Sequence, residues 1–117
     1  MKRYDNFFLP AKDLEESKKF YNETLGLNLK FEFEKQGMAA YHVGEEEPAI
    51  ILKDISMYPN FQPTIWFEVE NVKETYEKLK NQGISFTSEP FRIRTGWAVE
   101  FLDPSGNRLG ITDYTNE

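Results

Sequence analysis

Apolar and polar positions along the chain describe the same order of elements twice. Residues 13–26 and 71–83 loosely repeat one another: each segment begins at a residue that caps helices, has apolar positions three and four apart, and ends at a glycine. Each segment follows a short apolar stretch and precedes several more. A unit with one helix cannot cover both faces of its sheet, so two such units must share a core. The pattern therefore predicts two βαβββ modules.

The first module spans about residues 1–56. An apolar strand over residues 7–9 is expected to close at Pro10, and Asp13 is expected to cap a helix that ends at Gly26. The predicted inward stripe of this helix is Leu14, Ser17, Tyr21, Thr24 and Leu25. Alternating or apolar runs predict the three strands that follow, over residues 27–34, 38–43 and 49–52.

The second module spans residues 64–117 and follows a proline-punctuated linker over residues 57–63. A strand over residues 64–69 leads into a helix capped by Asn71, whose apolar stripe is Val72, Thr75, Tyr76 and Leu79. Further strands are predicted over residues 84–87, 92–94, 97–102 and 109–114. Asp103 to Gly106 have the residues of a type I turn, which makes the last two strands a hairpin. We expect one domain over residues 1–117.

Composition excludes several classes of function. Cysteine is absent, which rules out disulfides, thiolate metal sites and a cysteine nucleophile. The net charge of −6 disfavours nucleic-acid binding, and Arg92 with Arg94 is the only close arginine pair. No apolar run approaches the ~20 residues that span a bilayer, and no secretory signal pattern is evident, so we expect a cytoplasmic protein without membrane contact. The acidity fits solubility, or attraction for a cationic ligand.

Three segments carry a resemblance to a known family. Residues 13–26, 66–72 and 101–107, in this order and spacing, resemble the vicinal oxygen chelate superfamily, which holds glyoxalase I, the bleomycin resistance proteins, fosfomycin resistance enzymes and extradiol dioxygenases. The resemblance covers essentially the whole chain. It implies an α+β fold in which paired βαβββ modules form a cup-shaped mixed sheet around a ligand or metal. It also implies a homodimer, as for many single-domain members.

The resemblance also indicates where a metal would be bound. The four ligand positions of the metal-dependent members fall at or beside Asn6, Ile51, Thr64 and Gly110. Isoleucine and glycine side chains offer no donor atom, and Asn or Thr oxygens bind transition metals weakly. The single histidine, His42, lies alone on a strand, where a structural or exposed role is more common than metal binding. We therefore predict no metal and no other cofactor.

Strand alternation predicts which side chains share the face of the cup. Asn6 and Phe8 should lie on one face. A second set should also share a face: Thr64, Trp66, Glu68, Ala98, Glu100, Leu102, Gly110 and Thr112. Trp66 would give a flat surface for a planar or cationic ligand, although ordinary core packing explains it equally well.

Charged residues within apolar strands are the remaining candidates. Glu68 and Glu100 either face solvent or are buried, and a buried carboxylate points to an ion pair or a function. Arg92 or Arg94 would neutralise an inward Glu100, or both would face an anionic ligand. Trp97 is a candidate for the rim. The predicted ligand-binding set is Asn6, Phe8, Thr64, Trp66, Glu68, Arg92, Arg94, Trp97 and Glu100.

Three functions are compatible with these residues. The first is a metal-free small-molecule binding protein of the bleomycin-resistance type, sequestering a cationic or aromatic compound. The second is a metal-dependent lyase, isomerase or thiol transferase of the glyoxalase class, or a proton-transfer enzyme that uses Glu100 alone as general base. The third is a structural or regulatory dimer without a ligand. The missing metal ligands favour the first over the second.

Overall fold

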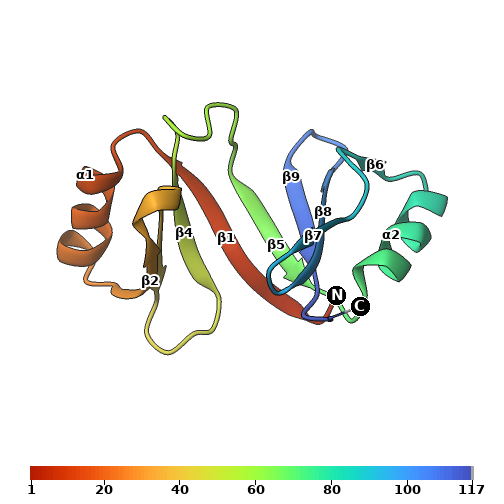
Figure 1. The fold of residues 1–117 in the computed structure, drawn as a ribbon, viewed down its shortest axis with the longest axis horizontal. Helices are drawn as coiled ribbons and strands as arrows, with labels where there is room; N and C mark the ends of the chain where they lie inside the picture. The colour runs from red at the N-terminus through yellow and green to blue at the C-terminus, as the bar shows by residue number, and fades with distance from the viewer. Residues whose placement is uncertain (117) are drawn as a thin grey trace. The chain divides into compact units, whose positions relative to one another are not determined.

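A computed structural model describes residues 1–116 (Figure 1). Within these residues the chain forms nine strands, two α-helices, one π-helical turn and one 3-10 turn. The elements of the first half are β1 (Arg3–Ala11), α1 (Leu14–Lys19), the π turn η1 (Phe20–Thr24), β2 (Asn28–Phe33), η2 (Glu34–Gln36), β3 (Met38–His42) and β4 (Ala49–Asp54). Those of the second half are β5 (Thr64–Glu68), α2 (Val72–Asn81), β6 (Ser85–Phe86), β7 (Phe91–Ile93), β8 (Gly96–Leu102) and β9 (Arg108–Thr112). In the described part of the chain no helix is long and apolar enough to cross a bilayer.

The N-terminal unit comprises residues Asn6–Pro63. Its strands follow the order β2-β3-β4-β1, in which β1 is parallel to β4 and the other pairs are antiparallel. Helix α1 lies beside β4, and Leu14 with Tyr21 packs on a cluster built around Tyr41 and Leu52. The predicted cap is present, because Asp13 Oδ1 accepts a hydrogen bond from the Glu16 N–H at 3.1 Å.

Two predictions for the first module are wrong in detail. Strand β1 does not close at Pro10, which lies within the strand opposite Lys53; every second N–H of a strand points away from a given neighbour, so a proline is tolerated there. The helical stretch reaches the predicted stop at Gly26, but after Lys19 it is a π turn, closed by the Leu25 N–H on the Phe20 carbonyl at 2.9 Å. This wider turn shifts the register, so Leu25 is 50% exposed instead of facing inward, and Thr24 is exposed as well.

The C-terminal unit comprises Met1–Asp5 and the chain from Thr64 onward. Its strands follow the order β5-β9-β8-β6, with β7 also paired to β8, and β5 is parallel to β9. Both modules therefore place their first strand beside and parallel to their last. The α2 stripe is as predicted, since Val72 and Tyr76 are buried against Val99 and Ile111. The α+β class of paired βαβββ modules is confirmed.

Candidate functional site

One face of the sheet in the C-terminal unit collects the side chains that alternation predicted. Helix α2 packs on the opposite face, which presents Val99, Phe101 and Ile111. Trp66 pairs with Gly110, and Gly110 pairs with Glu100, so these three positions form one row across β5, β9 and β8. We call this side of the sheet the Trp66 face; its positions are Thr64, Trp66, Glu68, Ala98, Glu100, Leu102, Arg108, Gly110 and Thr112.

The indole of Trp66 lies directly over Gly110. A Cβ atom built on Gly110 would stand 2.5 Å from Cε3 and 2.6 Å from Cδ2 of Trp66, closer than any side chain allows. The half-buried ring therefore takes the space in which a residue-110 side chain would stand. At the place where the resemblance puts the fourth metal ligand, the sheet presents an indole ring.

Glu100 lies on the Trp66 face and forms an ion pair with Arg108. Arg108 Nη1 donates to Glu100 Oε1 at 3.2 Å, and the two side chains are 32% and 25% exposed. The partner that the structure gives Glu100 is therefore Arg108, whereas the sequence had pointed to Arg92 or Arg94. Arg92 Nη1 donates instead to the Thr115 carbonyl at 3.0 Å. The signal that was overlooked is spacing: Arg108 precedes Gly110 by two residues and so shares its face.

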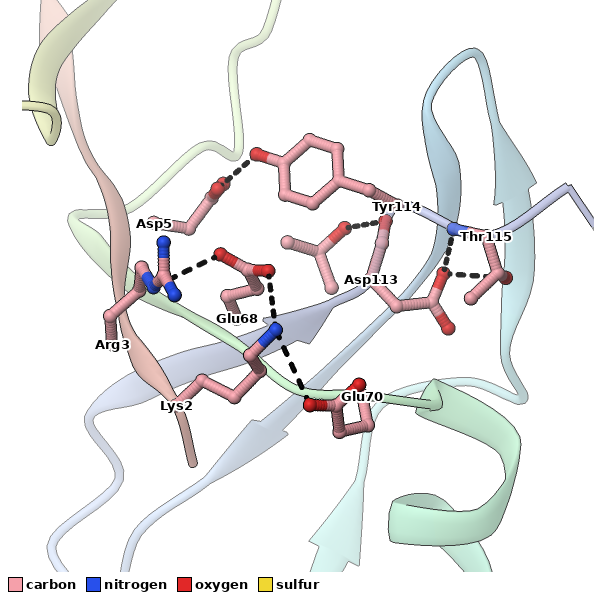
Figure 2. A network of polar contacts seen from close by, with 9 residues as sticks. Lys2, Arg3, Asp5, Glu68, Glu70, Asp113, Tyr114 and Thr115 are labelled. Carbon is pink, nitrogen blue, oxygen red and sulfur yellow. Dashed lines mark hydrogen bonds and ion pairs between the residues drawn. The ribbon is translucent and has the colours of Figure 1, made fainter.

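Glu68 is held by two cations at the other end of the same face. Its side chain is 17% exposed, and its carboxylate lies 3.4 Å from Lys2 Nζ and 3.6 Å from Arg3 Nε. Figure 2 shows Lys2 reaching both Glu68 and Glu70, the latter at 3.3 Å. The pairing offsets the cost of burying this carboxylate, so the ion-pair interpretation of Glu68 accounts for its position.

Beside this network, Tyr114 donates a short hydrogen bond to Asp5 (Figure 2). Partial burial of the phenol, the bond to Asp5 and the charges of Asp5 and Glu68 raise the pKa of Tyr114 well above its usual value. The hydroxyl therefore stays protonated at neutral pH and acts as a donor.

Asp113 is a buried carboxylate that sequence reasoning placed inside the last strand. It is 1% exposed and follows the end of β9. Its carboxylate accepts hydrogen bonds from the N–H groups of Val72 at 2.7 Å and Trp97 at 2.9 Å, and from the Thr115 hydroxyl at 3.0 Å. A Cβ on Gly96 would stand 2.2 Å from the Asp113 carbonyl oxygen, so only glycine fits there. Asp113 thus ties α2 to β8, which is a structural role.

Trp97 is not on the Trp66 face. It packs against the cluster under α2, with Lys73 Nζ 3.9 Å and the Arg92 guanidinium 5.8 Å from its ring centroid. Of the predicted ligand-binding residues in this unit, the structure brings together Thr64, Trp66, Glu68 and Glu100. Arg92 and Trp97 lie side by side elsewhere on the unit.

In the N-terminal unit, Asn6 and Phe8 share a face as predicted. The Asn6 carboxamide oxygen accepts from the Ala49 N–H at 3.0 Å. Phe8 belongs to an aromatic group around Lys53, whose Nζ lies 5.6 Å from the Phe8 centroid, 4.2 Å from Tyr58 and 4.8 Å from Phe61. Such cation–π contacts stabilise a partly desolvated ammonium. Alternation identified Phe8 alone, because Tyr58 and Phe61 lie in the patternless linker.

A second cluster in this unit surrounds Lys18. Together with Glu32, Tyr41 and neighbouring side chains of α1 it lines a shallow hollow of about 260 Å³. Hydrogen bonds to Glu32 and Glu15 raise the pKa of Lys18 in spite of its burial. A lysine held in its charged form is a poor nucleophile, so Lys18 is suited to ion pairing with Glu32 and Glu15.

The four expected metal positions do not supply a set of metal donors. Asn6 uses its oxygen on Ala49, Ile51 is buried in an apolar cluster, and Gly110 is covered by an indole. Among residues 1–116, no group of three or more His, Asp or Glu side chains could hold a metal ion. His42 Nδ1 lies 3.5 Å from the Glu46 carbonyl oxygen. Zinc, nickel, manganese and iron need imidazole, thiolate or carboxylate ligands, and these residues do not fit them.

The fold and the matches to known proteins define the class. Residues 3–111 match the Glyoxalase/Bleomycin resistance protein/Dioxygenase superfamily, and the chain belongs to this family. The uncharacterized protein YetH of Bacillus subtilis is 29% identical over 103 residues, which cover 83% of this chain and 86% of YetH.

Solved structures share the fold at low sequence identity. Methylmalonyl-CoA epimerase from Mycobacterium tuberculosis is similar with a TM-score of 0.76 and 17% identity, over 97% of this chain and 88% of the other. A structure described as NAD-dependent benzaldehyde dehydrogenase from Legionella pneumophila gives a TM-score of 0.75 and 18% identity, over 94% and 98%. A superfamily member from Vibrio splendidus gives 0.69 and 14%, over 93% and 96%. At these identities the likeness extends to the fold alone.

Proposed function

We propose that this protein is a small-molecule-binding member of the superfamily that needs no metal, and that its Trp66 face binds a planar aromatic compound. The observation that carries the proposal is the indole of Trp66 lying over Gly110, in one row with Glu100. A flat ring fixed on a sheet offers a stacking surface worth ~1 kcal/mol beyond the area it buries. The same ring stands where a metal-dependent member would need a ligand.

The charges of this face favour an aromatic over a cationic ligand. Both of its carboxylates have cationic partners: Glu100 is paired with Arg108, and Glu68 with Lys2 and Arg3. The net charge of −6 therefore does not accumulate beside Trp66. Stacking and shape, which do not depend on charge, are left as the main source of affinity.

The test is a screen of planar aromatic fragments in the presence of a metal chelator, read as thermal stabilisation. Fragments should raise the Tm of the wild type, because a ligand that binds only the folded state stabilises it. The Trp97→Phe variant serves as a matched control and should respond like the wild type, whereas Trp66→Leu should lose the response. A response that survives in Trp66→Leu would place the ligand elsewhere, and fragments that stabilise only after a divalent metal is added would restore the metalloenzyme interpretation.

A further inference from the structure

Arg108 lies on the Trp66 face and carries a buried guanidinium nitrogen that has no hydrogen-bond partner among the described residues. It lies on β9 opposite Thr64 and Leu102, in the row adjacent to that of Trp66, Gly110 and Glu100. Adjacent rows on one face are two residues apart along the strand, which is roughly 7 Å. A two-ring planar compound stacked on the indole reaches that row.

The ion pair between Arg108 and Glu100 is incomplete. A guanidinium has five N–H donors in a fork that matches a carboxylate through two parallel bonds. Here Nη1 alone bonds Glu100, through one oxygen at 3.2 Å. The Nε atom is buried and has no hydrogen-bond partner. A buried donor without a partner costs free energy that a suitable acceptor recovers. Because Nε is covered here, an added carboxylate reaches this edge of the fork only when the guanidinium turns away from Glu100.

We propose that Arg108 selects planar ligands that carry a carboxylate, binding the acid group along its Nε edge while the ring system stacks on Trp66. This inference rests on the proposed function and names its ligand class. Glu100 competes with the ligand for Arg108. In the absence of ligand, Glu100 holds the guanidinium on the Trp66 face. A ligand carboxylate with better geometry displaces Glu100 from the guanidinium. Arg108 is then the residue that sets specificity, and Trp66 supplies stacking that is indifferent to charge.

The experiment compares three probes with one ring system: naphthoate, naphthamide and naphthylmethylammonium. Binding is followed by Trp66 fluorescence in the Trp97→Phe protein, in which Trp66 is the only tryptophan. Naphthoate should bind about tenfold more tightly than naphthamide, the ratio that one well-made charge-assisted bond supplies. Arg108→Met should abolish this preference and leave naphthamide binding unchanged. Arg108→Lys, which keeps the charge without the fork, should retain only part of the preference. Glu100→Gln should strengthen naphthoate binding, because it removes the competitor.

The outcomes separate this inference from the proposed function. Equal affinity for the three probes, or a preference for the ammonium probe, would overturn the carboxylate selection. The proposed binding of aromatic compounds on the Trp66 face would still stand. A loss of affinity for all three probes in both Arg108 variants would mean that Arg108 supports the fold and does not select ligands. If none of the probes binds saturably to the Trp97→Phe protein, both proposals are overturned.

Discussion

At the scale of single residues, the contacts of Trp66, Glu100 and Asp113 show what sequence can and cannot predict. Trp66 was identifiable as a candidate because strand alternation puts it on a face with other unusual residues. Its position over Gly110 depends on a partner 44 residues away, which only the register of β5 on β9 supplies. The same holds for Arg108 with Glu100 and for Asp113. Spacing places Arg108 and Glu100 on one face, but which residues stand opposite one another depends on the register of β8 on β9, which local spacing does not encode.

Asp113 gives the clearest prediction at this scale. Replacing it with Asn should lower the free energy of unfolding by about 3 kcal/mol at neutral pH, because charge-assisted hydrogen bonds are lost and an amide N–H₂ faces backbone donors. Denaturant titration measures this loss. The matched control is Glu77→Gln, which removes one exposed carboxylate from α2 and should change little.

The pH dependence follows from the same residue. Burial opposes ionisation of Asp113, but the hydrogen bonds from Val72, Trp97 and Thr115 outweigh it and hold its pKa below the usual value. The unfolded chain therefore takes up this proton first as the pH falls. The stabilisation is complete above about pH 4 and is lost as the pH drops toward the folded-state pKa. Asp113→Asn should flatten the acid limb of the stability curve, and an acid limb equal to that of the wild type would contradict this role.

At the scale of elements, the helix caps and the glycines that end both helical segments were predicted better than the turns and strand ends that packing decides. Asp13 and Asn71 both cap as expected, since each side chain accepts from the N–H three residues on, at 3.1 and 3.0 Å. Capping is local chemistry and is visible in sequence. The π turn after Lys19 and the passage of β1 through Pro10 are decided by packing and pairing with distant residues, and local patterns do not report them.

The cap of α2 is testable by a pair of substitutions. Asn71→Ala should lower the free energy of unfolding by about 1 kcal/mol, because the Glu74 N–H loses its acceptor. Asn71→Asp keeps an acceptor at the helix N-terminus and should remain close to the wild type. Urea denaturation of both variants checks this. Equal stability of the two would show that the Asp113 bond to the Val72 N–H holds the helix start alone.

At the scale of the whole molecule, the duplication made the fold predictable. Two helices with matching caps, each after one strand and before several, specify the βαβββ modules, and both modules indeed pair their first strand in parallel with their last. The faces of the strands also followed from alternation. The class of ligand could not be predicted from alternation, because it depends on which charged side chains pair with one another. For Glu100 the sequence pointed to Arg92 or Arg94 and not to Arg108.

We propose that this member of the superfamily works without a metal. Calorimetric titration of chelator-treated protein with zinc, nickel, manganese and iron(II) tests it most directly, with His42→Ala as a matched control for weak binding at the lone imidazole. We expect no stoichiometric, tight binding of any of the four ions to either protein, because Asn6, Ile51, Thr64 and Gly110 offer no competent donor set. Tight one-to-one binding that persists in His42→Ala would contradict it and would bring the metal-dependent enzyme back as the leading interpretation.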